Sequence, residues 1–193
     1  MYSIRKKGGT QVFDLGEEDY VIGTVGRLAI AKNQKLFLTA AQQAIEQGLK
    51  AVFLIAGTGP EETALRQLAA TLKIEKKIRF LGQVHDRILL YRTLDLFALT
   101  SLYEGLPIVL LEAMASGIPV ISTDLEGVRY VLEGGRYGTL VGSNNIAELT
   151  SAFLRSPSQA QVESARSKIE RDFSAINAVE AVSKIYKKWL NKN

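Results

Sequence analysis

The sequence predicts an α/β fold in which a single parallel sheet of about six strands is covered by helices on both faces. Two observations support this prediction: short, near-continuous apolar segments alternate with amphipathic helical segments, and glycine-rich loops follow the apolar segments. Strands that are apolar at nearly every position are typical of a parallel sheet with both faces buried. The length of 193 residues is enough for one sizeable domain with its own core.

Six apolar segments are expected to be strands, at residues 20–25, 51–56, 78–81, 96–99, 119–122 and, at an edge, 138–141. Helices are expected at about 34–47, 61–72 and 87–93, from Pro107, from 146 with a break at Pro157, and at about 175–190. The helix at 34–47 is the clearest, because its apolar residues share one face: Leu36, Phe37, Ala40, Ala41, Ala44 and Ile45. No repeat or interdomain linker interrupts the pattern, so we expect one Rossmann-like, doubly wound domain.

Four loops that follow strands are expected to form one crevice. They lie at residues 26–33, 57–60, 82–86 and 101–107. In open sheets of this class, ligands bind beyond the carboxyl ends of the strands. In the strand order 3-2-1-4-5-6, the first and fourth strands are neighbours and the switch point lies between them. The loops after these two strands are therefore the first place to look for a ligand site.

Composition excludes several classes of site. The chain has no cysteine, so it has no disulfide, thiolate metal site or cysteine nucleophile, and its one histidine, His85, excludes a multi-histidine metal site. The net charge of +4 suits an anionic ligand, but the basic residues are dispersed, so we expect no nucleic-acid partner. No apolar run approaches the ~18 residues of a membrane span, and the first nine residues lack a signal sequence. We expect a cytoplasmic protein.

The segment from Glu104 to Glu112 carries the clearest functional signal. Gly105 and Pro107 are followed by good helix formers, which predicts a loop that becomes a helix with Pro107 at its first position. The free amides and positive dipole end of such a helix suit a phosphate. Because carboxylates repel phosphate, we expect the two glutamates to bind hydroxyl groups of a molecule attached to it.

Two cations, Arg27 and Lys32, lie in the loop after the first strand, opposite this helix start. Together with the free amides they could bind a diphosphate without a metal ion. Glu112 lies about a turn and a half into its helix and can lean back toward the ligand, where a carboxylate suits the diol of a ribose. Glu104 could bind hydroxyls of a second polar group or stabilise positive charge developing on it.

A nicotinamide-dependent oxidoreductase is a weaker hypothesis. The fragment Gly57-Thr58-Gly59 follows the second strand and lacks the third glycine of the dinucleotide fingerprint. No complete fingerprint follows the first strand, so we do not expect NAD binding.

Several motifs in order resemble the donor-binding, C-terminal half of a family 4 retaining glycosyltransferase of the GT-B fold (glycosyl transferases group 1). The resemblance covers nearly all of residues 20–190. It is carried by the segments 25–28 with Lys32 and Asn33, 55–60, 80–82, 101–107 and 111–120. One departure is Tyr130, which stands where the family usually has an acidic residue.

The resemblance implies a role for each site residue. Arg27 and Lys32 would bind the donor diphosphate and stabilise the departing nucleoside diphosphate. Glu104 would bind the transferred sugar, which makes Arg27, Lys32 and Glu104 the candidate catalytic residues, and Glu112 would bind the ribose. The other candidate substrate-binding residues are Gly26, Gly59, Gly82, Val84, Gly105, Leu106, Pro107, Ile108 and Val109. Neither a cofactor nor a metal is implied; the donor is a nucleoside-diphosphate sugar.

The same resemblance implies a missing half. We expect residues 1–19 to be a lead-in or interdomain segment and 20–193 the donor-binding domain, with the N-terminal acceptor-binding domain absent. The full enzyme would transfer a hexosyl group in cell-surface polysaccharide or glycolipid synthesis, and its peripheral association with the membrane stays open. We expect this domain alone to be inactive. Two alternatives remain: a subunit of a two-chain glycosyltransferase and a non-catalytic nucleotide-binding module.

Overall fold

The computed structural model describes residues 9–155, 158–174, 177 and 183. Within them the strands are β1 (Tyr20–Val25), β2 (Ala51–Ala56), β3 (Ile78–Gly82), β4 (Leu96–Leu99), β5 (Val120–Thr123) and β6 (Thr139–Val141). The α-helices are α1 (Gly9–Val12), α2 (Gln34–Glu46), α3 (Glu62–Thr71), α4 (Arg87–Thr93), α5 (Ile108–Ala115), α6 (Glu126–Leu132), α7 (Ile146–Phe153) and α8 (Gln159–Asp172). Short 3-10 helices are η1 (Ile30–Lys32), η2 (Glu75–Lys77) and η3 (Glu133–Gly135).

The strands form one parallel sheet in the order β3-β2-β1-β4-β5-β6. The predicted fold class, strand order and edge position of β6 are therefore confirmed. β1 lies beside both β2 and β4, with Ile22 opposite Phe53 on one side and Leu96 on the other. The chain winds outward in both directions from β1, so the switch point lies between β1 and β4.

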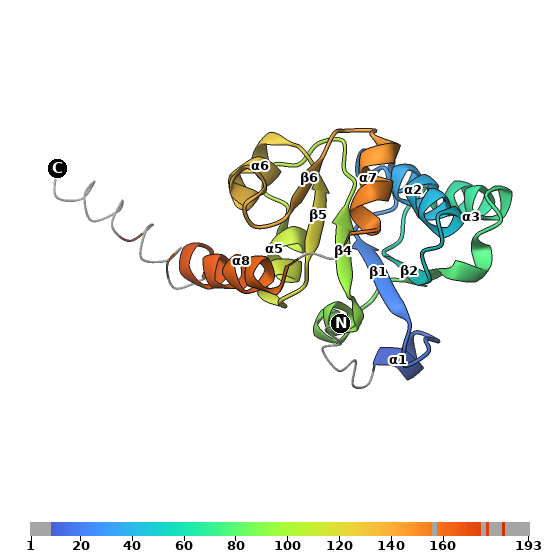
Figure 1. Ribbon diagram of the computed structural model, residues 1–193, viewed down its shortest axis with the longest axis horizontal. Helices are drawn as coiled ribbons and strands as arrows, with labels where there is room; N and C mark the ends of the chain where they lie inside the picture. Colours follow the sequence, from blue (N-terminus) through green and yellow to red (C-terminus); the bar gives the residue numbers. More distant parts are fainter. Residues whose placement is uncertain (1–8, 156–157, 175–176, 178–182, 184–193) are drawn as a thin grey trace.

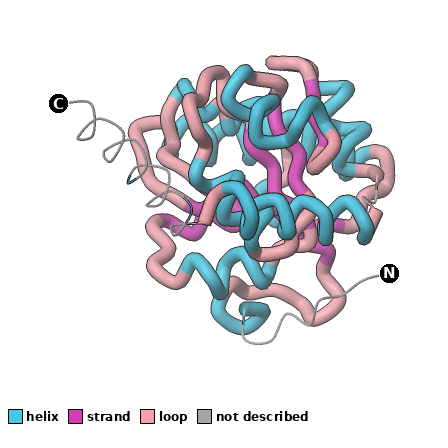
Figure 2. Tube along the Cα trace, turned by 90° about the vertical axis from the view of Figure 1, so that its left-hand side faces the viewer, coloured by secondary structure: helices cyan, strands magenta, loops and turns pink. Residues whose placement is uncertain are grey.

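Helices cover both faces of this sheet, as Figures 1 and 2 show. Alternate residues of a strand point to opposite faces, and this alternation divides the core into two clusters. Phe97 packs on the face covered by α4, α5, α6 and α8. Phe53 packs on the other face, against Phe37 of α2, Leu65 of α3 and Phe153 of α7. Rings of Phe37, Phe53 and Phe153 lie 5.7–5.9 Å apart, within the range of favourable aromatic pairs.

The structure also differs from the sequence-based expectation at several elements. α5 begins at Ile108, and Pro107 is its N-cap residue rather than its first helical residue. Neither α1 nor α6 was predicted: α1 has only 4 residues, and α6 has 7 with Gly127 near its start, a residue that lowers helix propensity. Phe13, in the expected lead-in, is buried in the cluster that contains Phe97. The helix expected at about 175–190 lies outside the described residues.

The described helices include none that is long and apolar enough to cross a membrane.

Candidate functional site

The loops at the carboxyl ends of the strands are joined to one another by hydrogen bonds. The amide of Gly26 donates to Ala56 (2.9 Å), and that of Gly57 donates to Gly82 (2.7 Å). Leu102 after β4 donates to Ala31 after β1, at 2.8 Å. These bonds confirm that the loops expected to form the crevice lie along one edge of the sheet.

Two glycines allow these loops to approach closely. A Cβ atom at Gly59 would lie 2.2 Å from the carbonyl oxygen of Leu28, and one at Gly127 would lie 1.6 Å from that of Gly105. Gly59, predicted to bind substrate, therefore has a packing role between the loops after β1 and β2. Gly127 was not selected from the sequence, because its contact with Gly105 joins segments that are distant along the chain.

Lys32 and Glu104 form an ion pair in the middle of this edge. Lys32 Nζ lies 2.5 Å from Glu104 Oε1, and the Ser101 hydroxyl donates to the same oxygen at 2.6 Å. The Glu104 side chain is only 11% exposed. The backbone supports the pair, since the Thr100 hydroxyl donates to the Lys32 carbonyl (3.0 Å). The sequence placed Lys32 and Glu104 on facing loops, and the structure brings them into direct contact.

Arg27, the second predicted cation, is exposed. Its backbone is fixed because the buried Gln34 donates from Nε2 to the Arg27 carbonyl at 3.0 Å. Within the described residues its guanidinium forms no ion pair with a carboxylate. Unlike Lys32, this cation therefore has no carboxylate among the described residues with which an incoming anion would have to compete.

The N-terminus of α5 lies between the two predicted glutamates in the chain. Leu110 and Leu111 donate their amides to the carbonyl of Pro107, at 3.0 and 3.3 Å. The amides of Ile108 and Val109 precede these first intrahelical donors, so they are the free ones expected at a helix start. Ile108 and Leu106 are exposed large apolar residues beside them, and Gly105 is exposed as well.

Glu112 is already engaged by two residues of α4. Its Oε2 accepts a hydrogen bond from the Arg87 guanidinium and one from the Tyr91 hydroxyl, the latter at 2.8 Å. The Glu112 side chain is 34% exposed, so a ligand can still reach it. The sequence analysis missed Arg87 and Tyr91. Their spacing of four residues on one short helix was the available signal, but it did not reveal a partner on another helix.

Gly82 is the last residue of β3, and Val84 lies in the loop that leads from β3 to α4. Gly82 has φ +65°, in the left-handed region that glycine adopts without strain. Val84 is half-buried and packs against the core cluster that contains Tyr91. His85 is exposed. Tyr130 is 72% exposed, and its ring lies 6.4 Å from that of Phe173.

A separate cavity of about 250 Å³ lies at the amino ends of the strands, on the opposite side of the sheet from the crevice loops. It is lined by residues at the amino ends of strands, including Leu96, Val120 and Thr139, and by Arg155. None of the predicted site residues lines this cavity. Among the described residues, no group of three or more acidic or histidine side chains is arranged to hold a metal ion.

The sequence match that identifies the family covers the segments that build the crevice. A profile of the family described as "Glycosyl transferases group 1" matches residues 10–168. The chain belongs to the glycosyl transferases group 1 family.

Curated relatives of this group 1 domain include bacterial glycosyltransferases. The Escherichia coli UDP-Gal:alpha-D-GlcNAc-diphosphoundecaprenol alpha-1,3-galactosyltransferase is 28% identical over 183 residues, which cover 91% of this chain and 47% of the relative. The putative colanic acid biosynthesis glycosyltransferase WcaL of Escherichia coli K12 is 33% identical over 165 residues, covering 78% of this chain and 41% of the relative. The chain thus spans about half the length of the curated relatives it matches.

Solved structures share the fold of this group 1 domain. Anabaena Alr3699/HepE in complex with UDP superposes with a TM-score of 0.88 at 21% identity, over 97% of this chain and 54% of that one. A glycosyltransferase from Rickettsia africae superposes with a TM-score of 0.85 at 21% identity, over 100% of this chain and 54% of that one. At this level of identity the similarity establishes the fold alone.

Proposed function

We propose that the chain is the C-terminal, donor-binding domain of a family 4 retaining glycosyltransferase of the GT-B fold. In this proposal it binds a nucleoside-diphosphate sugar, and the full-length enzyme transfers a hexosyl group from it to an acceptor. The observation that carries the proposal is the arrangement around α5: Glu104 and Glu112 flank its N-terminus, and Lys32 from the opposite loop contacts the first glutamate.

Each part of a nucleotide sugar has a chemically suitable partner along this edge. The diphosphate would lie at the free amides of Ile108 and Val109, where the helix dipole favours negative charge. Arg27 and Lys32 would supply two positive charges, each worth on the order of 4 kcal/mol in Coulomb energy at a protein-like dielectric before desolvation is subtracted. This charge supply is why we propose that donor binding needs no metal ion.

The two carboxylates would hold the hydroxyl-bearing groups at either end of the diphosphate. Glu112 would accept hydrogen bonds from the ribose, and the nearby backbone of Gly82 and Val84 would flank the base. Glu104 would accept bonds from the transferred sugar. The remaining proposed contacts are made by the backbone of Gly26, Gly59, Gly105, Leu106 and Pro107.

The same residues would act in the transfer step. When the bond between sugar and phosphate breaks, negative charge grows on the departing nucleoside diphosphate. Arg27 and Lys32, already placed at the diphosphate, would stabilise that charge without reorganisation. Glu104 would stabilise the positive charge that develops on the sugar. The retention of stereochemistry in this proposal rests on the resemblance to family 4.

Transfer would also need the acceptor-binding half. The matched relatives are about twice as long as this chain, so we propose that an acceptor-binding domain stands N-terminal to it in the full enzyme. The alternative of a two-chain enzyme predicts copurification with a second glycosyltransferase-like chain. The names of two relatives, a galactosyltransferase named for GlcNAc-diphosphoundecaprenol and a putative colanic acid biosynthesis glycosyltransferase, support a role in cell-surface polysaccharide or glycolipid synthesis. We propose that this role is cytoplasmic.

Isothermal calorimetry with UDP, GDP and ADP tests the proposal. We expect one of them to bind with a micromolar to millimolar Kd, and we expect EDTA to leave that Kd unchanged. Glu112→Gln should weaken binding by about tenfold, the effect of losing a hydrogen bond to a charged group. Absence of binding by all three at millimolar concentration would contradict the proposed function.

A further inference from the structure

The described residues hold each glutamate of the crevice at one carboxylate oxygen, Glu104 at Oε1 and Glu112 at Oε2. For Glu112, the Arg87 guanidinium and the Tyr91 hydroxyl both donate to Oε2. Within the described residues, no hydrogen bond to Oε1 of Glu112 is formed by the protein. This carboxylate is therefore fixed at one oxygen and able to accept hydrogen bonds from a ligand at the other.

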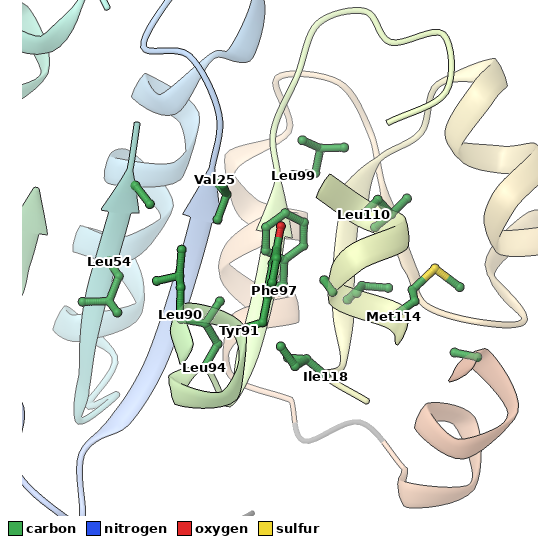
Figure 3. Close-up of a cluster of buried hydrophobic side chains, with 14 of the residues drawn as sticks. Val25, Leu54, Leu90, Tyr91, Leu94, Phe97, Leu99, Leu110, Met114 and Ile118 are labelled. Atoms are coloured by element: carbon green, nitrogen blue, oxygen red, sulfur yellow. The ribbon is translucent and has the colours of Figure 1, made fainter. Parts of the chain in front are cut away.

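The fold holds the backbone of Arg87 and the ring of Tyr91 in place. Asp86 caps α4 by accepting the Leu89 amide at 2.8 Å, which fixes the start of the helix at Arg87. Arg87 and Tyr91 are one turn apart, and the guanidinium lies 6.0 Å from the centre of the Tyr91 ring. That ring is only 2% exposed and packs edge-on against Phe97 of β4, at 6.0 Å. Figure 3 shows Tyr91 beside Phe97, within the cluster formed by α4, α5 and the strands.

The Tyr91 hydroxyl has one proton and two acceptors within reach. Glu112 Oε2 lies at 2.8 Å and the Val109 carbonyl at 3.2 Å. The shorter bond to a charged acceptor is the stronger one, so the proton points to Glu112. Burial, reinforced by the bond to Glu112, raises the pKa of Tyr91 above its ordinary value of 10.0. The hydroxyl thus keeps its proton at neutral pH and remains a donor.

Charge gives Arg87 a second effect. A carboxylate beside a diphosphate repels it, and the Glu112 side chain is close to the helix start at which we place that diphosphate. The Arg87 guanidinium offsets the charge of Glu112 at Oε2 and leaves the lone pairs of Oε1 accessible. A neighbouring cation therefore lets a carboxylate serve as a hydroxyl acceptor close to phosphate.

We propose that Arg87 and Tyr91 are positioning residues for Glu112, which hold Oε2 so that Oε1 accepts the ribose hydroxyls of a nucleoside diphosphate. This inference rests on the proposed function and deepens it. It assigns ribose recognition to a group of three residues on two helices, rather than to Glu112 alone. Neither Arg87 nor Tyr91 needs to touch the ligand.

The test compares each nucleoside diphosphate with its 2′,3′-dideoxy counterpart by calorimetry. The quantity measured is the ratio of the two Kd values, using whichever of UDP, GDP and ADP the wild-type chain binds. We expect a wild-type preference for the ribose form of about 10–100-fold, the range for hydrogen bonds to a charged group. Glu112→Gln should bring this ratio close to one.

The positioning variants should lower the same ratio. Arg87→Ala and Tyr91→Phe should each reduce it by about three- to tenfold, and Arg87→Lys should restore part of it because the positive charge returns. In the background of Glu112→Gln, Arg87→Ala should cause no further loss, since residues that act through one group are not additive. Tyr91→Phe keeps the ring that packs on Phe97, so its melting temperature should stay close to that of the wild type.

Arg66→Ala is the matched control. Arg66 also donates from Nη2 to a glutamate, Glu62, at 2.8 Å, and its guanidinium lies 4.4 Å from the centre of the Phe80 ring. It belongs to α3, on the opposite face of the sheet from α4. Its removal should leave the Kd ratio unchanged.

The outcomes separate this inference from the proposed function. If the wild-type chain binds none of the nucleotides, both are overturned. If it binds with a ribose preference that Glu112→Gln abolishes, while folded Arg87→Ala and Tyr91→Phe keep the wild-type ratio, only the positioning role is overturned. A loss of affinity that is equal for the ribose and dideoxy forms would likewise count against it.

Discussion

Lys32 Nζ lies 2.5 Å from Oε1 of Glu104, and the Ser101 hydroxyl shares that oxygen. The charge of Glu104 is therefore balanced before any ligand is bound. A diphosphate that recruits Lys32 must compete with this carboxylate, whereas Arg27 faces no such competition from the described residues. The two cations of the crevice thus make different contributions, which can be separated by mutation.

Glu104→Gln should separate phosphate binding from sugar binding. The variant frees Lys32 from its ion pair, so UDP should bind at least as tightly as it does to the wild type. The advantage of UDP-hexose over UDP should fall by about tenfold, because a charged acceptor for the sugar hydroxyls is lost. Calorimetry with both ligands gives the two numbers. Glu62→Gln, which removes the half-buried charged partner of Arg66, should change neither of these two numbers. If Glu104→Gln lowered the affinities for UDP and UDP-hexose equally, this separation of phosphate binding from sugar binding would be wrong.

Arg27→Ala should weaken diphosphate binding. We expect a loss of about 2–5 kcal/mol in affinity, the range seen when one partner of a buried charge pair is truncated. Lys50→Ala removes one positive charge just before the amino end of β2 and controls for the change in net charge. Titration of UDP into both variants is the measurement. An unchanged affinity in Arg27→Ala would show that this guanidinium stays in solvent when the nucleotide binds.

Gly127→Ala should destabilise the domain and displace the loop that carries Glu104. The new Cβ would lie 1.6 Å from the Gly105 carbonyl oxygen and 3.2 Å from that of Glu104, and no rotation of a side chain relieves a clash with backbone. Helix propensity alone favours alanine by about 1 kcal/mol, so a net loss isolates the clash. We expect a loss of about 1–3 kcal/mol in the free energy of unfolding.

Gly16→Ala is the control for Gly127→Ala, because its Cβ would meet nothing closer than the Asp19 side chain at 3.4 Å. Urea unfolding and UDP binding should both be close to wild type for Gly16→Ala and impaired for Gly127→Ala. A Gly127→Ala variant as stable as the wild type would mean that α6 can move away from the Gly105 loop at little cost.

Stability should fall in strong acid partly because of Asp172. Hydrogen bonds from Arg171 and then Lys168 lower the pKa of Asp172 from 3.8 to about 2. Because the folded state holds this carboxyl ionised to lower pH, the unfolded chain takes up its proton first as pH falls. The contribution is therefore present above about pH 4 and is lost between pH 4 and 2. Asp172→Asn should flatten the pH dependence of the melting temperature in that window.

Arg171→Gln tests the same effect by removing a hydrogen-bond partner of Asp172. With its strongest partner removed, the pKa of Asp172 should return toward its ordinary value, so the loss of stability between pH 4 and 2 should also become smaller. An unchanged slope in both variants would show that other carboxyl groups dominate the acid transition.

The fold could be predicted largely from local pattern. β1 and β2 are apolar at nearly every position, and the spacing of Leu36, Phe37 and Ala40 reports a helix directly, because burial imposes these periods on the chain. The positions of Lys32, Glu104 and Glu112 after β1 and β4 could be inferred as well, since parallel strands bring their carboxyl ends to one edge. α6 could not, because seven residues around a glycine have no clear period.

The sequence by itself therefore determined the doubly wound sheet and the end of the strands at which the charged residues gather, and the strand order followed from that fold class. Only the tertiary structure decided which of those charges meet. Whether Lys32 reaches Glu104, whether Arg87 and Tyr91 hold Glu112, and why Gly127 must lack a side chain depend on distances between segments that are far apart in the chain. Such distances are set by how helices and loops pack on the sheet, and residue order carries no local signal of them.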